Sequence, residues 1–131
     1  MAGSLNKTML IGNLGADPEA RTMQSGGRVV TFSLATTESW KDKESGERQE
    51  RTQWHRIAIY NEVLGKFAEK HLKKGAKVYL EGQLETRPWR DDKGREQQVT
   101  EVVLRPYRGE LTLLDTALGE RGTGERGDLA A

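Results

Sequence analysis

The sequence predicts an all-β protein, a small five-stranded Greek-key barrel with one helix between its third and fourth strands. Apolar residues recur with a period of two in segments 28–37, 52–60 and 76–87, which is typical of strands that bury one face. Only one segment changes to helical spacing, and this scarcity of helices excludes a parallel α/β fold. Hydrophobic residues make up 34% of the 131 residues and charged residues 31%, which favours a thin-walled β structure.

The first half of the chain carries the signals of three strands. The expected elements are a strand at 5–15, a connection at 17–27, a strand at 28–37, a polar hairpin loop at 39–51 and a strand at 52–60. The first strand is an apolar run that ends at glycines, and a Gly-Gly pair marks the turn in the connection. In the second strand, Val30, Phe32 and Leu34 alternate with smaller residues.

The second half begins with the expected helix, at residues 61–75, where apolar side chains follow a helical period. We expect Val63, Leu64, Phe67, Ala68 and Leu72 to form its apolar face. Asn61 can cap its start and Gly75 its end, with Lys73 and Lys74 in the last turn. The remaining expected elements are strands at 76–87 and 97–107 joined by a turn at 91–94, a short strand at 110–115, and a flexible Gly-rich tail at 116–131. One ordered domain at residues 1–115 is therefore expected.

The third strand, TQWHRIAIY, has two contrasting faces. Alternation places His55, Ile57 and Ile59 on the inner face, and Trp54, Arg56, Ala58 and Tyr60 on the outer face. A subunit interface could cover the outer aromatics, but an arginine between them makes a dry interface costly. A platform on which nucleobases stack, with the arginine meeting a phosphate, uses the same residues without that cost.

Two further tryptophans repeat this combination of an aromatic ring with cations. Trp40 precedes Lys41 and Lys43, and Trp89 lies between Arg87 and Arg90. Packing on the base of a hairpin is the alternative for either ring. Net charge is only +1, but residues 51–100 hold 11 lysines and arginines against 7 carboxylates, which permits a local basic groove.

Catalysis, a metal site and a membrane segment are not expected. There is no cysteine, the two histidines lack zinc-ligand spacing, and no phosphate-binding P-loop pattern occurs. His55 shares its face with isoleucines, so a core or interface role suits it better than general-base catalysis. No signal peptide or sufficiently long apolar span is present. We therefore expect a cytoplasmic binding protein without a cofactor.

Four blocks of the sequence closely resemble the bacterial single-stranded DNA-binding protein (SSB) family: NKTMLIGNLGADPEAR, FSLATTESWKDKESGE, TQWHRIAIYNEVLGKFAEKHLKKGAKVYLEGQLETR and TEVV. The likeness covers about residues 5 to 114. It implies an OB-fold that assembles as a homotetramer and coats single-stranded DNA, without strong sequence preference, in replication, repair and recombination. Such a protein would associate with the nucleoid.

The resemblance also implies roles for particular residues. Bases would stack on Trp40, Trp54, Tyr60 and Trp89. Phosphates would meet Lys7, Arg21, Lys41, Lys43, Arg56, Lys73 and Arg87. His55 would lie at a subunit interface. The family usually ends in an acidic tip that recruits replication and repair proteins. This sequence ends in GERGDLAA, as a truncated or divergent member would, so replication and repair proteins are possible partners but recruitment through such a tip is not expected.

Two other binding roles remain open. Primosomal barrels related to this family bind a helicase as well as DNA, and often lack several stacking tryptophans. A cold-shock-like barrel would bind RNA through a dense phenylalanine cluster on two adjacent strands, which this sequence lacks.

Overall fold

The structure is a computed structural model that describes residues 3–114. Its elements, in chain order, are β1 (Thr8–Leu14), β2 (Glu19–Thr22), β3 (Arg28–Lys41), β4 (Arg48–Ile59), α1 (Glu62–His71), β5 (Lys77–Arg90), β6 (Glu96–Leu104) and β7 (Glu110–Leu113). Within the described residues, no helix is long and apolar enough to cross a membrane.

Five of the strands close into a ring. Hydrogen bonding runs through β1, β3, β4, β6 and β5, and β5 pairs back onto β1. All of these pairings are antiparallel except the short parallel pairing of β4 with β6. The helix lies between β4 and β5, the third and fourth strands of the ring. The OB-fold expected from the sequence, with one helix at this place, is confirmed.

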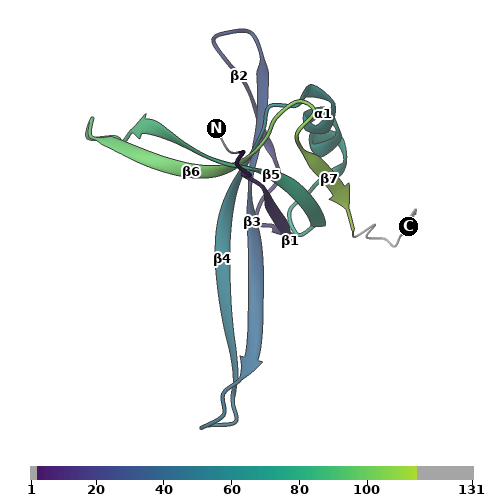
Figure 1. Cartoon of the computed structure of the whole chain (residues 1–131), viewed down its shortest axis with the longest axis vertical. Coiled ribbons are helices and arrows are strands. Elements are labelled where there is room, and N and C mark those ends of the chain that lie inside the picture. The colour runs from purple at the N-terminus through teal and green to yellow at the C-terminus, as the bar shows by residue number, and fades with distance from the viewer. Residues whose placement is uncertain (1–2, 115–131) are drawn as a thin grey trace.

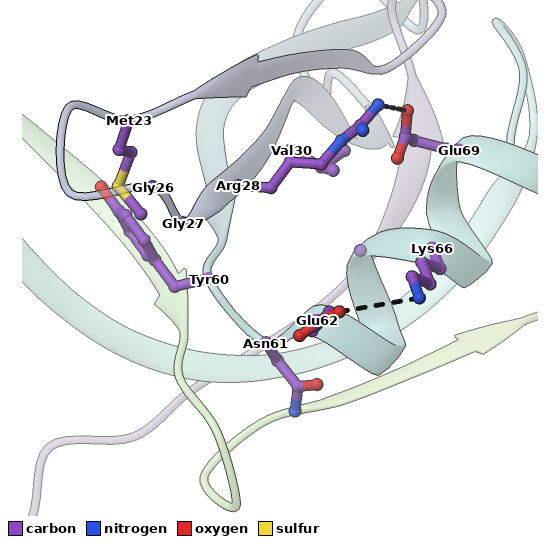
Figure 2. A pocket seen from close by; sticks show the side chains of 11 residues that line it. Met23, Gly26, Gly27, Arg28, Val30, Tyr60, Asn61, Glu62, Lys66 and Glu69 are labelled. Carbon is purple, nitrogen blue, oxygen red and sulfur yellow. Dashed lines mark hydrogen bonds and ion pairs between the residues drawn. The ribbon is translucent and has the colours of Figure 1, made fainter.

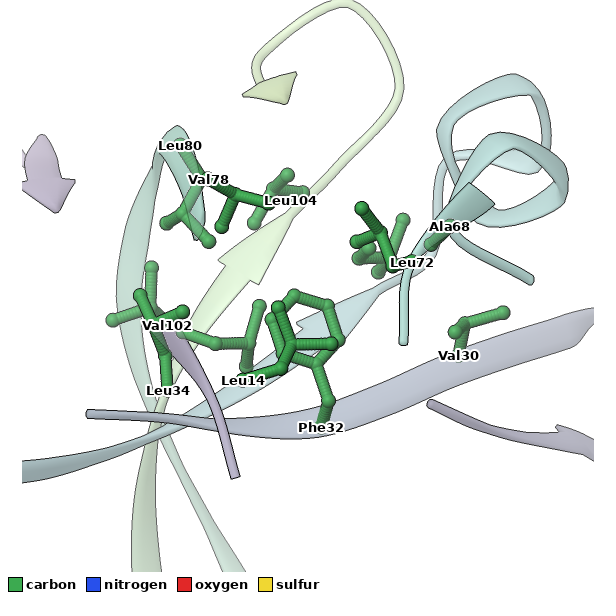
Figure 3. Packing of buried hydrophobic residues seen from close by; sticks show 12 residues of the cluster. Leu14, Val30, Phe32, Leu34, Ala68, Leu72, Val78, Leu80, Val102 and Leu104 are labelled. Atoms are coloured by element: carbon green, nitrogen blue, oxygen red, sulfur yellow. The ribbon is translucent and has the colours of Figure 1, made fainter. Parts of the chain in front are cut away.

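The core fills the inside of the ring and continues under the helix. Leu34, Ile57 and Leu80 from three different strands are 0% exposed, and Ala68 and Leu72 add the buried side of the helical segment (Figure 3). The alternation expected for the inner faces is therefore confirmed. Val63 is an exception, because it is 75% exposed instead of facing the core.

Two hairpins extend well beyond the ring as two-stranded ribbons (Figure 1). We call them the β3–β4 arm (residues 36–54) and the β5–β6 arm (residues 86–100). The β3–β4 pairing runs without a break from Val30↔Ile59 to Lys41↔Arg48, so the expected loop at 39–51 is wrong in extent. Backbone ladders and polar cross-strand pairs, such as the Thr37–Thr52 hydroxyl contact of 3.0 Å, continue the strands after the apolar pattern stops.

Two local expectations also need correction. The connection at 17–27 contains the short strand β2, which pairs along β3. Asn61 caps α1 as expected by accepting hydrogen bonds from the backbone N–H groups of Val63 and Leu64, but the helix ends at His71. Gly75 does not end the helix; it lies in a later turn with φ of 89°. The expected tail at 116–131 falls outside the described residues.

Candidate nucleic-acid interface

The strand register gathers the predicted aromatic and cationic residues on the outer face of β4, β6 and β5. In this face Ala58 pairs with Val103, Arg87 with Val99 and Trp89 with Gln97. We call this surface the outer face and define it by Trp54, Arg56, Tyr60, Arg87, Trp89 and Glu101. Strand β4 and the later β5–β6 hairpin thus bring indole rings and guanidinium groups onto one surface.

A buried carboxylate fixes the two arginines of the outer face. Glu101 is 3% exposed and accepts hydrogen bonds from Arg56 Nε at 2.7 Å and Arg87 Nε at 3.1 Å. Burial of Glu101 by itself raises its pKa, but the hydrogen bonds from Arg87 and Arg56 outweigh burial and hold the pKa below its ordinary value. Both arginines remain close to half exposed, so each is held in place and still open to a ligand.

Tyr60 follows β4 and is held where the ring closes, since its backbone N–H donates to Leu104 O at 2.9 Å. The guanidinium of Arg105 lies over the Tyr60 ring, 4.7 Å from its centroid, and forms a two-pronged ion pair with Glu85. Hydrogen bonding to Arg105 lowers the pKa of Glu85. One side of the phenol ring is therefore already stacked against a cation.

The outer face is less open around Ala58 than the sequence suggests. Ala58 is 1% exposed, because it forms a small cluster with Val29 and Val103 against which Met23 and Tyr60 pack. The reason is tertiary: β2 and the turn after it bring Met23 over this part of the sheet. Ala58 thus supports Tyr60 from below and offers no surface of its own.

A pocket of about 330 Å³, lined in part by Tyr60, lies between the β2–β3 turn and the start of α1 (Figure 2). Both of its cations are paired with carboxylates. Arg28 meets Glu69 at 2.7 Å and Lys66 meets Glu62 at 3.6 Å. The pocket therefore continues the surface beside Tyr60 without adding an unpaired charge.

Trp54 is the most exposed of the three tryptophans, at 62%. Its ring lies against Gly15, where a Cβ added to the glycine would come within 2.5 Å of Trp54 Cζ3. The turn that contains Lys73 is hydrogen-bonded to the neighbouring end of β1, because Gly75 N donates to Leu14 O at 2.8 Å. The absent side chain at Gly15 makes room for the indole, and the turn brings Lys73 to the same end of the ring.

Trp40 and Trp89 lie on the two arms. Trp89 is 44% exposed and belongs to the outer face on the β5–β6 arm. Trp40 is 41% exposed, but it pairs with Gln49, which puts it on the opposite face of its ribbon from Trp54. There the Arg51 guanidinium lies 5.5 Å from its ring centroid. The structure therefore brings Trp54, Tyr60 and Trp89 onto one face and leaves Trp40 apart from them.

The remaining predicted cations come from the segment before β1, from β2 and from the far end of the β3–β4 arm. Lys7 pairs with Glu81 at 3.1 Å, and Arg21 in β2 lies 3.8 Å from Glu19. Lys41 ends β3, and Lys43 lies in the turn at the tip of that arm. His55 lies where the β3–β4 arm leaves the ring, half-buried, with its Nε2 2.9 Å from Thr36 Oγ1.

Sequence reasoning missed Glu101 of the outer face, and it missed Arg105, which stacks on Tyr60. Nothing near either residue in the sequence shows that it will meet Tyr60 or Arg56, because the residues in contact are about 45 positions apart. It also missed Tyr107, which is fully exposed in the loop after β6. The pattern Arg-Pro-Tyr-Arg, an aromatic residue between cations, was the signal that could have found it.

Comparison with known proteins agrees with this geometry. The sequence model described as "Single-strand binding protein family" matches residues 5–110. A single-stranded DNA-binding protein of Rhizobium meliloti (strain 1021) is 52% identical over 122 residues, covering 93% of this chain and 70% of the relative. One of Rickettsia felis is 50% identical over 127 residues, covering 97% and 84%.

A solved structure is similar over nearly the same span. The Plasmodium falciparum SSB, in complex with single-stranded DNA, superposes with a TM-score of 0.77 and 41% sequence identity. The match covers 88% of this chain and 99% of that one.

Proposed function

The chain belongs to the single-strand binding protein family, and on this premise we propose that it binds single-stranded DNA without reading its sequence. It acts as a binding protein and not as an enzyme. By occupying unpaired strands it shifts the equilibrium away from duplex and hairpin forms through mass action. Its ligands are the single-stranded DNA segments exposed in replication, repair and recombination, so it acts at the nucleoid.

The observation that carries this proposal is the outer face itself. Exposed rings at Trp54 and Trp89 flank arginines that a buried carboxylate holds in place. Bases stack on Trp54, Tyr60 and Trp89, while Arg56 and Arg87 contact phosphates between them. Every base offers a π-face and every nucleotide a phosphate, so this chemistry does not discriminate sequence. Duplex DNA binds weakly because its bases are already stacked on one another.

The two arms extend this surface. Trp40 offers a further stacking site on the β3–β4 arm, and Lys41 and Lys43 contact phosphates near its tip. Lys73, Arg21 and Lys7 contact the backbone around the ring. Because Trp40 lies on the opposite face of the ribbon from Trp54, a strand that contacts both must pass around the arm or bind two copies of the chain.

We further propose that the protein assembles as a homotetramer. Residues 8–12 of β1 pair with β5 alone, which leaves their other edge unpaired within the described structure. On the exposed side of the same strand, Met9 is 62% and Ile11 54% exposed. An open strand edge beside apolar side chains suits pairing with a second copy. His55, half-buried at the root of the arm, contributes to a subunit contact.

A titration with oligo-dT, read by tryptophan emission and by native mass, tests these proposals together. Coating predicts strong quenching of emission and a mass of four chains. Unchanged emission at saturating oligomer would remove the stacking mechanism and favour a protein-binding barrel. Competition by an RNA oligomer of equal length separates DNA binding from RNA binding, since a preference for RNA would contradict the assignment.

A further inference from the structure

Tyr107 combines an unfavourable backbone conformation with complete exposure. Its φ is 64°, in the left-handed region, and it is the one non-glycine residue with positive φ in residues 3–114. Its side chain is 102% exposed, so no packing among residues 3–114 compensates for the strain. Backbone strain is often retained at sites that bind a ligand, and here no described residue packs on the side chain to account for it.

The local geometry explains how the ring is presented. Arg108 N donates to Arg105 O at 3.1 Å, which closes a four-residue turn with Pro106 and Tyr107 at its centre. Proline fixes a negative φ at the second position, so a positive φ at the third makes this a type II turn, where glycine or asparagine is favoured. Tyrosine occupies the position that would suit glycine best, and its ring points away from the barrel.

The turn is anchored to the outer face at its first residue. Arg105 stacks on Tyr60 and pairs with Glu85 through two hydrogen bonds, of 2.7 and 3.0 Å. Tyr107 is therefore two residues from a group that already contacts a proposed stacking ring. A rigid anchor reduces the entropy lost when a ligand orders the loop.

A shallow pocket joins Tyr107 to the same row of β5 side chains. This pocket, of about 340 Å³, is lined by Tyr107 and Arg108 together with Leu5 and Gln83. Gln83, Glu85, Arg87 and Trp89 alternate outward along β5, so the pocket continues the row that begins at Trp89. None of the ion pairs among the described residues involves Arg108, which leaves its charge for a ligand.

We propose that Tyr107 is an additional base-stacking site for single-stranded DNA, with Arg108 as its phosphate contact. The proposal rests on the proposed function and extends it: the strand continues past Tyr60 and Arg105 onto the turn after β6. An aromatic ring open on both faces, next to a cation, has the chemistry that an unpaired nucleotide requires. A base stacked there covers part of the pocket beside Leu5.

Tyr107→Gly separates this role from a structural one, because the two predict different results. Glycine relieves the positive φ, so the midpoint of thermal unfolding should stay or rise. Affinity for a long oligo-dT should fall about fivefold or more, by the loss of one stacked base. Tyr107→Phe keeps the ring and should keep the affinity. Val63→Ala, which truncates another exposed apolar side chain, on α1, should change neither quantity.

A covalent readout completes the test. Oligo-dT carrying 5-iododeoxyuridine, irradiated in complex with the wild-type protein, should give a peptide adduct at Tyr107. Suppose that wild-type protein binds oligo-dT and is quenched normally, but gives no adduct at Tyr107, and that the Tyr107→Gly variant binds with equal affinity. This result would overturn the inference and leave the proposed function standing. Wild-type protein that fails to bind oligo-dT would overturn the proposed function instead.

Discussion

Replacing Trp54 with alanine is the most direct test of the outer face. The indole is 62% exposed and stands beside Arg56, so it is available to a base without rearrangement of the barrel. Trp54→Phe is the matched control, because it keeps an aromatic face at the same position of the strand.

The structure sets the expected magnitudes. A stacked base is worth about 1–3 kcal/mol, which corresponds to a roughly 5- to 150-fold weaker dissociation constant for Trp54→Ala. A fully buried tryptophan covers up to about 250 Å². Because Trp54 is 62% exposed, only about 90 Å² of it is covered, and this area contributes at most roughly 2 kcal/mol to the free energy of unfolding. The substitution should therefore weaken binding while leaving the protein folded.

Fluorescence anisotropy of a labelled oligo-dT measures the affinity, and thermal unfolding of the same preparations checks the fold. Both are read at one protein concentration, since any assembly makes stability concentration-dependent. We expect Trp54→Phe to bind within a few-fold of wild type. A folded Trp54→Ala variant with wild-type affinity would refute the stacking role of the outer face.

Three further predictions concern charge, salt and the edge of the barrel. Glu101→Gln should lower the free energy of unfolding in urea by about 1 kcal/mol at neutral pH, because its arginine partners are near half exposed and regain water. Since the pKa of Glu101 is lowered in the fold, its contribution is present above the ordinary value near 4.5 and is lost as pH falls through the folded pKa. The gap between wild type and variant should shrink in acid, and a pH-independent gap would contradict the ion-pair account. Lys41→Ala should reduce the magnitude of the slope of log affinity against log salt concentration by about 0.7, the value of one phosphate contact. Lys41→Arg keeps the charge and should preserve the slope. An unchanged slope in the alanine variant would show that Lys41 does not contact the DNA. Asn6→Ala should lower the free energy of unfolding in urea by about 1–2 kcal/mol. The Asn6 amide donates one hydrogen bond of 2.9 Å to the Leu84 carbonyl and accepts another of 2.9 Å from the Leu84 N–H. An unaltered unfolding midpoint would show that water replaces these hydrogen bonds without loss.

Alternation of apolar residues was sufficient to predict the ring and its core. Phe32 and Leu34 face inward, as their alternation with Thr31 and Ser33 predicts. Where β4 meets β6 the alternation is no guide, because Ala58 and Val103 are buried on the outer face as well. The same signal failed in the arms, where no core lies behind the strands and both faces are polar. It failed for β2 as well, since Glu-Ala-Arg-Thr offers only Ala20 to the interior.

The stacking candidates were visible in the sequence, but their grouping was not. An aromatic residue beside cations could be recognised at Trp40, Trp54 and Trp89, and all three are exposed as expected. Their DNA contacts remain predictions. That Trp40 faces away from Trp54 follows only from the register of β3 against β4, and the stacking of Arg105 on Tyr60 depends on ring closure.

Strands β3 and β4 each have two parts, one inside the ring and one in the β3–β4 arm, and the two parts have different roles. The segment inside the ring determines whether the protein folds, and the segment beyond it determines how far the protein reaches. Side chains alternate between the two faces of the arm. A longer or shorter arm that keeps each aromatic side chain on its present face must therefore gain or lose two residues at a time on each strand, in steps of about 6.6 Å. Reach in such a molecule is adjustable only in discrete increments, and the interior need not change with it.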